Sequence, residues 1–369
     1  MLNSVHLRNF KGFEEESIGL RQLTLLSGPN SSGKSSVIQA LVLLRQIDWQ
    51  RSPNTDHAEL LPTGQFLSLG TGRDLLHEYA KTDVLSIGVG MDSGERREWI
   101  FDYLPTSGKL ISKDVISRED LEFVRALPLT YLAAERWGPR TTYPYEDSEP
   151  EGSLGVLGQY TFRHLLDHGD DPVENLSLHH PQALGKGLLH QVAAWLGEIS
   201  PGVKMDVQAL KSVGLASAGF GFDRKGDVAS RYYRPANVGF GLSYSISMIV
   251  ALLCSTKKSL ILLENPEAHL HPRGQSSLAR LIVRASSLAQ VIVETHSDHV
   301  MNGIRVAVKR RELSADQVAF HYLVRDGVTS RVQTPTLDSE GRLSFWPEGF
   351  FDQHDRDLAA LVRRPGTKE

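Results

Sequence analysis

Cysteine is almost absent from this chain of 369 residues, and Cys254 is the only one. A single cysteine cannot form an internal disulfide and cannot supply a thiolate cluster for structural zinc. Because Cys254 stands at the end of the apolar run SISMIVALLCS, we expect a small buried side chain there.

Excess positive charge and long apolar runs are also missing. The formal net charge is -4 and the pI is about 6.4, so no global positive field indicates nucleic-acid binding, although a local basic groove stays open. The longest apolar stretch, from Ile246 to Cys254, is too short to span a bilayer. The N-terminus, MLNSVHLRNFKGF, lacks the apolar core of a signal peptide. We therefore expect a cytoplasmic protein with no membrane partner.

Hydrophobic residues make up 40% of the chain, enough for a sizeable core, and the length favours two or three domains. Strand-like apolar patterns cover 4–10, 23–26, 127–133, 260–263 and 290–293. Helical spacing covers 35–47, 158–168, 188–199, 243–253 and 274–285. Glycine-punctuated strands are expected within 63–102 and 203–233, and the polar stretch 140–152 is expected to be an exposed loop.

The segment GPNSSGKS, Gly28 to Ser35, matches the P-loop pattern G-x-x-x-x-G-K-[ST] in full. It follows an apolar strand and precedes a helical pattern, which is the order that a P-loop needs. Its glycines allow backbone N–H groups to face phosphate oxygens. Lys34 would place a charge at the terminal phosphates, and the Ser35 hydroxyl would bind Mg²⁺. The predicted nucleotide-binding residues here are Gly28, Pro29, Asn30, Ser31, Ser32, Gly33, Lys34, Ser35 and Ser36.

The segment SLILLENPEAHLHP, 259–272, is an apolar strand that ends in carboxylates, as a Walker B element does. Glu264 is the candidate on the Mg²⁺ side, so the predicted metal residues are Ser35 and Glu264, and Glu267 is a second carboxylate. The segment QVIVETHSD, 290–298, is another strand, and it places His296 where a histidine could sense the terminal phosphate or position water.

Two other patterns are weaker. The segment NVGFGLSYS, 237–245, offers glycines and a helix N-terminus to an anion, but a glycine turn that caps a helix explains it equally well. Four histidines have spacings that resemble zinc ligands, but the nucleotide motifs account for the same neighbourhood, so zinc is disfavoured. They are His269, His271, His296 and His299.

Together these motifs resemble the ABC-type ATPase heads of the SMC, RecF and OLD group. The order is an N-terminal LRNFKGF strand, P-loop, signature region, Walker B and switch histidine. More narrowly, YLAAERWGPR, NVGFGLS, ENPEAHLHP, ETHSDH and FFDQHDRDLAALV resemble an OLD-like subfamily with a C-terminal domain of unknown function. The resemblance implies an α/β P-loop fold, with a mixed central sheet flanked by helices and an inserted α+β region.

The resemblance also assigns roles to residues. It implies ATP and Mg²⁺ as cofactors, with Lys34, Glu264, Asn265, Glu267 and His296 as the catalytic set. Gly241, Leu242 and Ser243 match the ABC signature, which in the family contacts the nucleotide of a second subunit. That implies a head-to-tail homodimer around two ATP molecules, or a higher oligomer.

Two positions depart from the family pattern. The signature lacks the usual glycine pair after its serine. Asn265 stands where the family has a glutamate that polarises the attacking water, and an amide cannot accept a proton. Glu267 could replace it, or hydrolysis could be slow, which would suit a switch better than a motor.

OLD nucleases carry a metal-dependent Toprim domain after the head, and too few residues follow His296 for one. The acidic residues Asp352, Asp355 and Asp357 fit a solvated helix start better than a metal cluster. The basic cluster 309–311 could contact DNA, although a solvated face is the stronger interpretation.

The expected organisation is an ATPase lobe with Walker A at 1–100, an inserted region at 101–234, the rest of the head at 235–305 and a small C-terminal region at 306–369. We expect a dimerising ATP switch in DNA maintenance or antiphage defence, with a separately encoded effector such as a nuclease. Two alternatives remain: a repair or recombination ATPase that binds DNA directly, and a nucleotide-binding scaffold or sensor with negligible hydrolysis.

Overall fold

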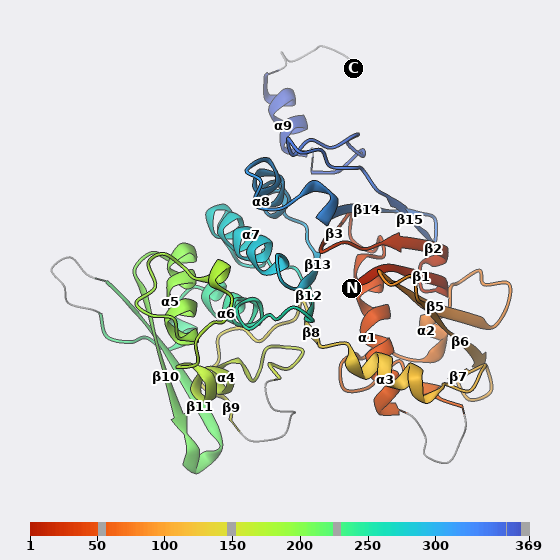
Figure 1. The fold of residues 1–369 in the computed structure, drawn as a ribbon, viewed down its shortest axis with the longest axis horizontal. Helices are drawn as coiled ribbons and strands as arrows, with labels where there is room; N and C mark the ends of the chain where they lie inside the picture. The colour runs from red at the N-terminus through yellow and green to blue at the C-terminus, as the bar shows by residue number, and fades with distance from the viewer. Residues whose placement is uncertain (51–56, 146–152, 224–229, 352, 363–369) are drawn as a thin grey trace.

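A six-stranded mixed sheet forms the centre of the computed structural model, which describes residues 1–50, 57–145, 153–223, 230–351 and 353–362 (Figure 1). Its strand order is β15-β14-β3-β13-β12-β8, and every neighbouring pair is parallel except β14 with β15. All five positions of β3, β12 and β13 are buried, which explains their continuous apolar sequences. The bounds are β3 (Leu23–Ser27), β8 (Leu129–Leu132), β12 (Leu260–Glu264), β13 (Gln290–Glu294), β14 (Val318–Asp326) and β15 (Thr329–Gln333).

A second six-stranded sheet is antiparallel and has the order β2-β1-β5-β6-β7-β4. Its inner face shares a hydrophobic core with helix α1 (Lys34–Gln50), which follows the P-loop. Strand β6 spans residue 100, and β8 pairs with β12 in the central sheet. The remaining elements are β1 (Leu2–Phe10), β2 (Phe13–Gly19), β4 (Glu59–Leu60), β5 (Val84–Met91), β6 (Arg96–Leu104), β7 (Lys109–Ser112), α2 (Gly72–Leu75) and α3 (Arg118–Ala126).

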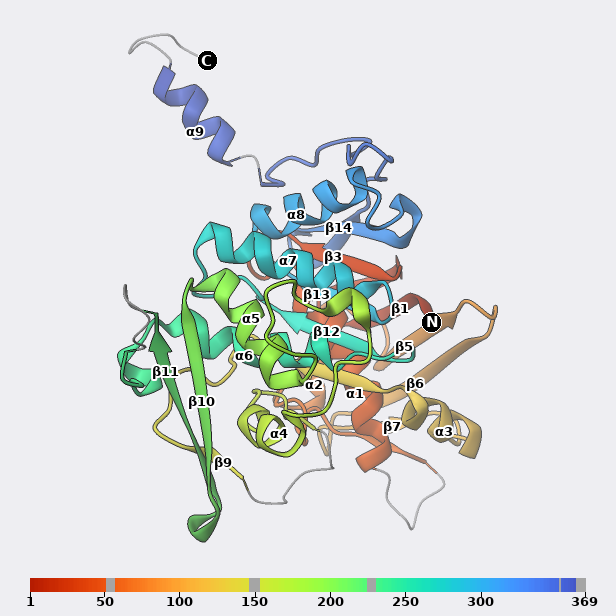
Figure 2. The same ribbon diagram turned by 60° about the vertical axis from the view of Figure 1, so that its left-hand side comes forward.

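Helices α6 (Phe240–Leu253), α7 (Pro272–Ser286) and α8 (Asp298–Lys309) contribute to a second core, on the other side of the central sheet. Between β8 and α6 the chain adds α4 (Thr161–His168), α5 (Leu188–Ile199) and a three-stranded sheet of order β10-β11-β9. Figure 2 shows β10 and β11 as a long hairpin at the edge of the molecule, and α9 (Gln353–Val362) extending away from its body. The other bounds are β9 (Tyr143–Pro144), β10 (Val203–Leu210), β11 (Leu215–Phe222) and the 3-10 turns Leu176–Leu178, Lys211–Val213, Pro235–Asn237 and Ala315–Gln317.

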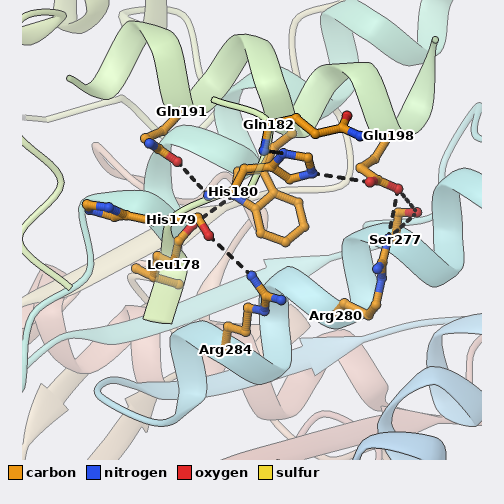
Figure 3. Close-up of polar contacts among 10 residues, drawn as sticks. Leu178, His179, His180, Gln182, Gln191, Glu198, Ser277, Arg280 and Arg284 are labelled. Atoms are coloured by element: carbon orange, nitrogen blue, oxygen red, sulfur yellow. Dashed lines mark hydrogen bonds and ion pairs between the residues drawn. The ribbon is translucent and has the colours of Figure 1, made fainter. Parts of the chain in front are cut away.

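A polar cluster connects α5 to α7 (Figure 3). The Glu198 carboxylate on α5 contacts His180 Nε2 at 3.1 Å and accepts from Arg280 Nη2 at 2.8 Å. It also accepts a hydrogen bond of 3.3 Å from the Ser277 hydroxyl. Because Ser277 and Arg280 lie on α7, which starts directly after the Walker B segment, this cluster connects α5 to the chain that follows β12.

The structure corrects two expectations, the burial of Cys254 and the exposed loop at 140–152. Cys254 is exposed, because it follows the last residue of the buried helix α6 and forms its C-cap. Within the expected loop 140–152, Tyr143 is buried and starts β9, whereas 146–152 lie outside the described residues. Among the described helices, none is both long and apolar enough to cross a membrane.

Candidate functional site

The P-loop connects β3 to α1, as the sequence predicts, and two of its glycines are sterically required. Gly28 has a φ of 141°, and a Cβ atom there would lie 2.1 Å from the Leu323 carbonyl oxygen. Gly33 has a φ of 102°, and a Cβ atom there would lie 2.7 Å from the Ser330 hydroxyl oxygen. Only glycine adopts this backbone in so little space, so the loop can curl tightly against β14 and β15.

A pocket of about 610 Å³ opens over the P-loop. From the predicted set it is lined by Asn30, Ser31, Ser32, Gly33, Lys34, Ser35, Ser36, Asn265 and His296. Residues that were not predicted from the sequence complete it: Lys11, Gly12, Gln39, Asp74, Leu76, Glu78, Glu294, Arg325, Val328 and Ser330. The other predicted residues are not part of the lining: Gly28, Pro29, Gly241, Ser243, Glu264 and Glu267.

Lys34 is buried, with 4% of its surface exposed, and its ammonium group is held by its own loop. Nζ donates to the carbonyl oxygens of Gly28 at 3.0 Å and Pro29 at 2.7 Å. Burial lowers the pKa of Lys34, while the nearby carboxylates of Glu294 and Glu267 act in the opposite direction. Lys34 thus lines the pocket with two carbonyls of its own loop as partners.

Glu294 is the carboxylate that contacts the P-loop. Its Oε1 accepts a 3.0 Å hydrogen bond from the Ser35 hydroxyl, and the residue is 5% exposed. Burial, and then repulsion from Glu264, raise the pKa of Glu294 to about 7. Glu294 was not among the predicted site residues, although it directly precedes Thr295 and His296 in the ETHSD motif. Its place at the end of an apolar strand, as for Glu264, is the sequence feature from which it could have been predicted.

Glu264 ends β12 and faces a different set of donors. Its Oε1 accepts from the Tyr131 hydroxyl at 3.0 Å, and its Oε2 accepts from the Ala134 backbone N–H at 3.1 Å. Burial raises the pKa of Glu264, although these hydrogen bonds and the charge of Arg136 act in the opposite direction. The structure thus ties Glu264 to the YLAAERW segment, whose strand β8 pairs with β12.

Arg136 is a buried residue of this segment to which the sequence motifs assigned no role. Its guanidinium donates to the carbonyl oxygens of Ala133 at 2.7 Å, Glu264 at 2.5 Å and Asn265 at 2.8 Å. Burial lowers the pKa of Arg136 to about 10. These bonds hold the backbone where β12 turns into the following loop, so Arg136 positions Asn265 at the pocket.

The turn after β12 is locked to the end of β13. Asn265 has a φ of 45° and donates its backbone N–H to the Glu294 carbonyl at 2.9 Å. Glu267 accepts from the Thr295 hydroxyl and from the His296 backbone N–H, both at 2.6 Å. His296 itself is exposed, and burial of part of its ring together with the charge of Lys34 lowers its pKa. Glu267 is therefore engaged in holding the His296 segment.

The predicted signature lies at the start of α6 and outside the pocket. Gly241 packs so closely that a Cβ atom would lie 2.6 Å from the His269 carbonyl oxygen. Ser243 is 7% exposed, whereas Phe240 is 56% exposed. The ring of His269 packs against Phe240 and Tyr244, with centroids 5.6 Å and 4.6 Å apart. The signature thus contacts the turn after β12, and in one chain it does not reach the P-loop pocket.

The four histidines considered for zinc have separate surroundings. His269 packs on aromatic rings, and His271 Nδ1 accepts from the Arg273 N–H at the start of α7. His296 lines the pocket, and His299 Nε2 lies 3.7 Å from Asp298 Oδ1. Across the described residues, no three histidine, cysteine or acidic side chains converge as a metal site would require. Of the acidic residues that were predicted to lie at a solvated helix start, Asp357 is exposed on α9, which starts at Gln353. Asp352 lies outside the described residues.

Comparison with protein families divides the chain into three matched segments. Residues 1–111 match an AAA ATPase domain, and residues 201–302 match a family described as "AAA domain, putative AbiEii toxin, Type IV TA system". Residues 313–361 match a family described as a protein of unknown function, DUF3696. No curated protein matches the chain. The two ATPase matches contain the P-loop and the Walker B segment, respectively.

Solved SMC head structures share the fold. An SMC head bound to the C-winged helix domain of ScpA is 14% identical, with a TM-score of 0.53 over 91% of this chain and 98% of that one. An SMC head domain with an extended coiled coil, bound to the C-terminal domain of ScpA and derived from Pyrococcus furiosus, is 12% identical, with a TM-score of 0.51 over 98% and 99%. The chain therefore has the mixed α/β fold of an SMC head, an ABC-type P-loop architecture.

Proposed function

We propose that this chain binds ATP and Mg²⁺ in the P-loop pocket and hydrolyses the nucleotide. The observation that carries the proposal is the buried Lys34, which lines a pocket of about 610 Å³. That volume lies in the range of about 300–1,000 Å³ usual for small-molecule sites. Phosphate oxygens would take the place of the Gly28 and Pro29 carbonyls as partners of Lys34, and the N–H groups at the start of α1 would add to their binding. Ser35 would supply a hydroxyl ligand to the cation.

Slow hydrolysis is part of the proposal. Asn265 is the pocket residue at the position of the family's catalytic glutamate, and its amide cannot take a proton from water. Glu267 does not line the pocket, and its two oxygens already accept hydrogen bonds from Thr295 and His296. Neither residue is poised as a general base, which favours a switch that holds ATP over a motor that turns it over quickly.

The signature supports a nucleotide-dependent homodimer. The start of α6 presents exposed Phe240 next to Gly241 and Ser243, and these residues lie outside the pocket of their own chain. A terminal phosphate can reach this helix start only in a second copy, as in head-to-tail ABC dimers. We infer that ATP closes two copies around two nucleotides.

The cellular role we propose is a switch in DNA maintenance or antiphage defence that acts on a separately encoded effector such as a nuclease, in the cytoplasm. A scaffold or sensor with negligible hydrolysis is the second candidate, and Asn265 is the observation that favours it. Measurement of the ATP turnover rate separates the two, because only the switch hydrolyses ATP.

A third possibility, direct DNA binding, would appear as an affinity for DNA that falls steeply as the salt concentration rises.

The decisive experiment is calorimetric titration of the full chain with ADP and with a non-hydrolysable ATP analogue. We expect Lys34→Ala to weaken binding by at least about tenfold, which corresponds to about 1.4 kcal/mol. Lys257→Ala is the matched control, since Lys257 is exposed in the loop after α6. Equal nucleotide affinities of wild type and Lys34→Ala, with both folded, would rule the proposed site out.

A further inference from the structure

Three oxygen atoms on residues that line the P-loop pocket are buried without a hydrogen-bond partner. Within the part of the chain that the structure describes, they are Ser32 Oγ, Asn265 Oδ1 and Glu294 Oε2. A buried polar atom without a partner costs about 1–3 kcal/mol, and more when it is charged. A built pocket with such atoms is suited to a ligand that supplies their partners. For a carboxylate oxygen, that partner is a cation or a hydrogen-bond donor.

Glu294 and Glu264 differ in the number of carboxylate oxygens that already have a hydrogen-bond partner. Both oxygens of Glu264 accept hydrogen bonds within the protein, from Tyr131 and from the Ala134 N–H. Glu294 uses Oε1 for the Ser35 hydroxyl and leaves Oε2 unpartnered. Glu294 also lines the pocket, and Glu264 does not.

The strand order explains this difference. In the central sheet, β13 lies between β12 and β3, with Glu264 opposite Glu294 and Glu294 opposite Leu26. Neighbours in register point to the same face of a sheet, so the two carboxylates stand side by side. Glu294 is on the strand next to the P-loop strand, and Glu264 is one strand farther away. Of these two carboxylates, Glu294 is the one that accepts the hydrogen bond of Ser35.

From this geometry we infer that Glu294, together with Ser35, holds the divalent cation of the nucleotide site, in place of the Walker B residue Glu264. A hydroxyl and a carboxylate oxygen are the hard ligands that Mg²⁺ takes from protein sites that leave its other positions to water and phosphate. The inference rests on the proposed nucleotide function and assigns its metal residue. Glu264 then serves as a positioning residue that anchors β8 and the Arg136 segment.

The test measures metal-dependent binding and needs no turnover. ADP affinity of the full chain is measured calorimetrically in Mg²⁺ and in EDTA, and Mn²⁺ bound with ADP is followed by electron paramagnetic resonance. The variants are Glu294→Gln, Glu294→Asp and Glu264→Gln, each checked for folding by circular dichroism. Glu294→Gln still offers an oxygen to Ser35 but lacks the charge, and Glu294→Asp keeps the charge but withdraws it by one methylene.

We expect Mg²⁺ to tighten ADP binding to wild type by about tenfold. Glu294→Gln should reduce this metal effect to within about twofold and lose the Mn²⁺–ADP signal. Glu294→Asp should show a metal effect between those of wild type and Glu294→Gln. Glu264→Gln should keep at least half of the wild-type effect on a logarithmic scale. The inference is overturned if Glu294→Gln keeps the metal effect, or if Glu264→Gln loses as much as Glu294→Gln. ADP binding to wild type without a metal effect refutes this inference alone. Absence of ADP binding to wild type refutes the proposed function and the metal assignment with it.

Discussion

Replacement of Arg136 by methionine should destabilise the head strongly. Arg136 is 2% exposed, and its guanidinium donates to three backbone carbonyls, at 2.7, 2.5 and 2.8 Å. Methionine fills similar space but donates nothing, so each of these three carbonyls loses a hydrogen bond, and Asn265 keeps only the one that it accepts from the Ala268 N–H at 3.2 Å. With about 1–1.5 kcal/mol for each hydrogen bond, the expected loss is about 3–4.5 kcal/mol of unfolding free energy. Removal of the desolvation penalty of a buried charge offsets part of this, but an unpaired buried group usually outweighs that gain.

The assay is urea unfolding followed by circular dichroism, with the change read from the midpoint at constant slope. Arg136→Lys keeps the charge but lacks the planar fork that reaches three carbonyls, so it should lose about half as much. Arg140→Met is the matched control: Arg140 is exposed, and its main contact is the Trp137 ring at 4.7 Å. That contact is worth about 0.5–1 kcal/mol. A loss below about 1 kcal/mol for Arg136→Met would refute the assigned role of its hydrogen bonds.

Three further predictions concern pH, turnover and assembly. Burial lowers the pKa of His164 to about 4, whereas the unfolded chain protonates near 6.5. The unfolded state binds more protons between these values, so stability should fall by at most about 3 kcal/mol as pH drops from 6.5 to 4. His164→Gln should reduce this loss of unfolding free energy, whereas the control His190→Gln, at an exposed residue, should not. The reasoning is contradicted if His164→Gln loses as much stability between pH 6.5 and 4 as wild type does. Single-turnover hydrolysis should accelerate in Asn265→Glu, and no gain in rate would count against Asn265 as the cause of slow turnover. Light scattering should show wild type becoming dimeric with a non-hydrolysable ATP analogue, and Phe240→Glu staying monomeric; a dimeric variant would exclude the start of α6 from the interface.

Local patterns in the sequence account for much of the site. The P-loop could be predicted because glycine spacing, Lys34 and Ser35 lie within eight consecutive residues between an apolar strand and a helix. The buried strands β3, β12 and β13 could be predicted from apolar runs, since a strand covered on both faces needs apolar side chains throughout. Helix α5 has the predicted bounds, 188–199, because its apolar residues repeat with helical spacing.

Non-local packing decided the rest. Sequence spacing contains no strand order, so it could not show that β13 separates β12 from β3 and brings Glu294, rather than Glu264, against Ser35. Nor could it show that Arg136, far from the P-loop in the chain, binds the backbone at Asn265, because that contact depends on β8 pairing with β12. The sequence by itself determined that a phosphate-binding loop is present. Tertiary structure decided which carboxylate faces it, because the pairing of distant strands sets which side chains share an edge of the sheet.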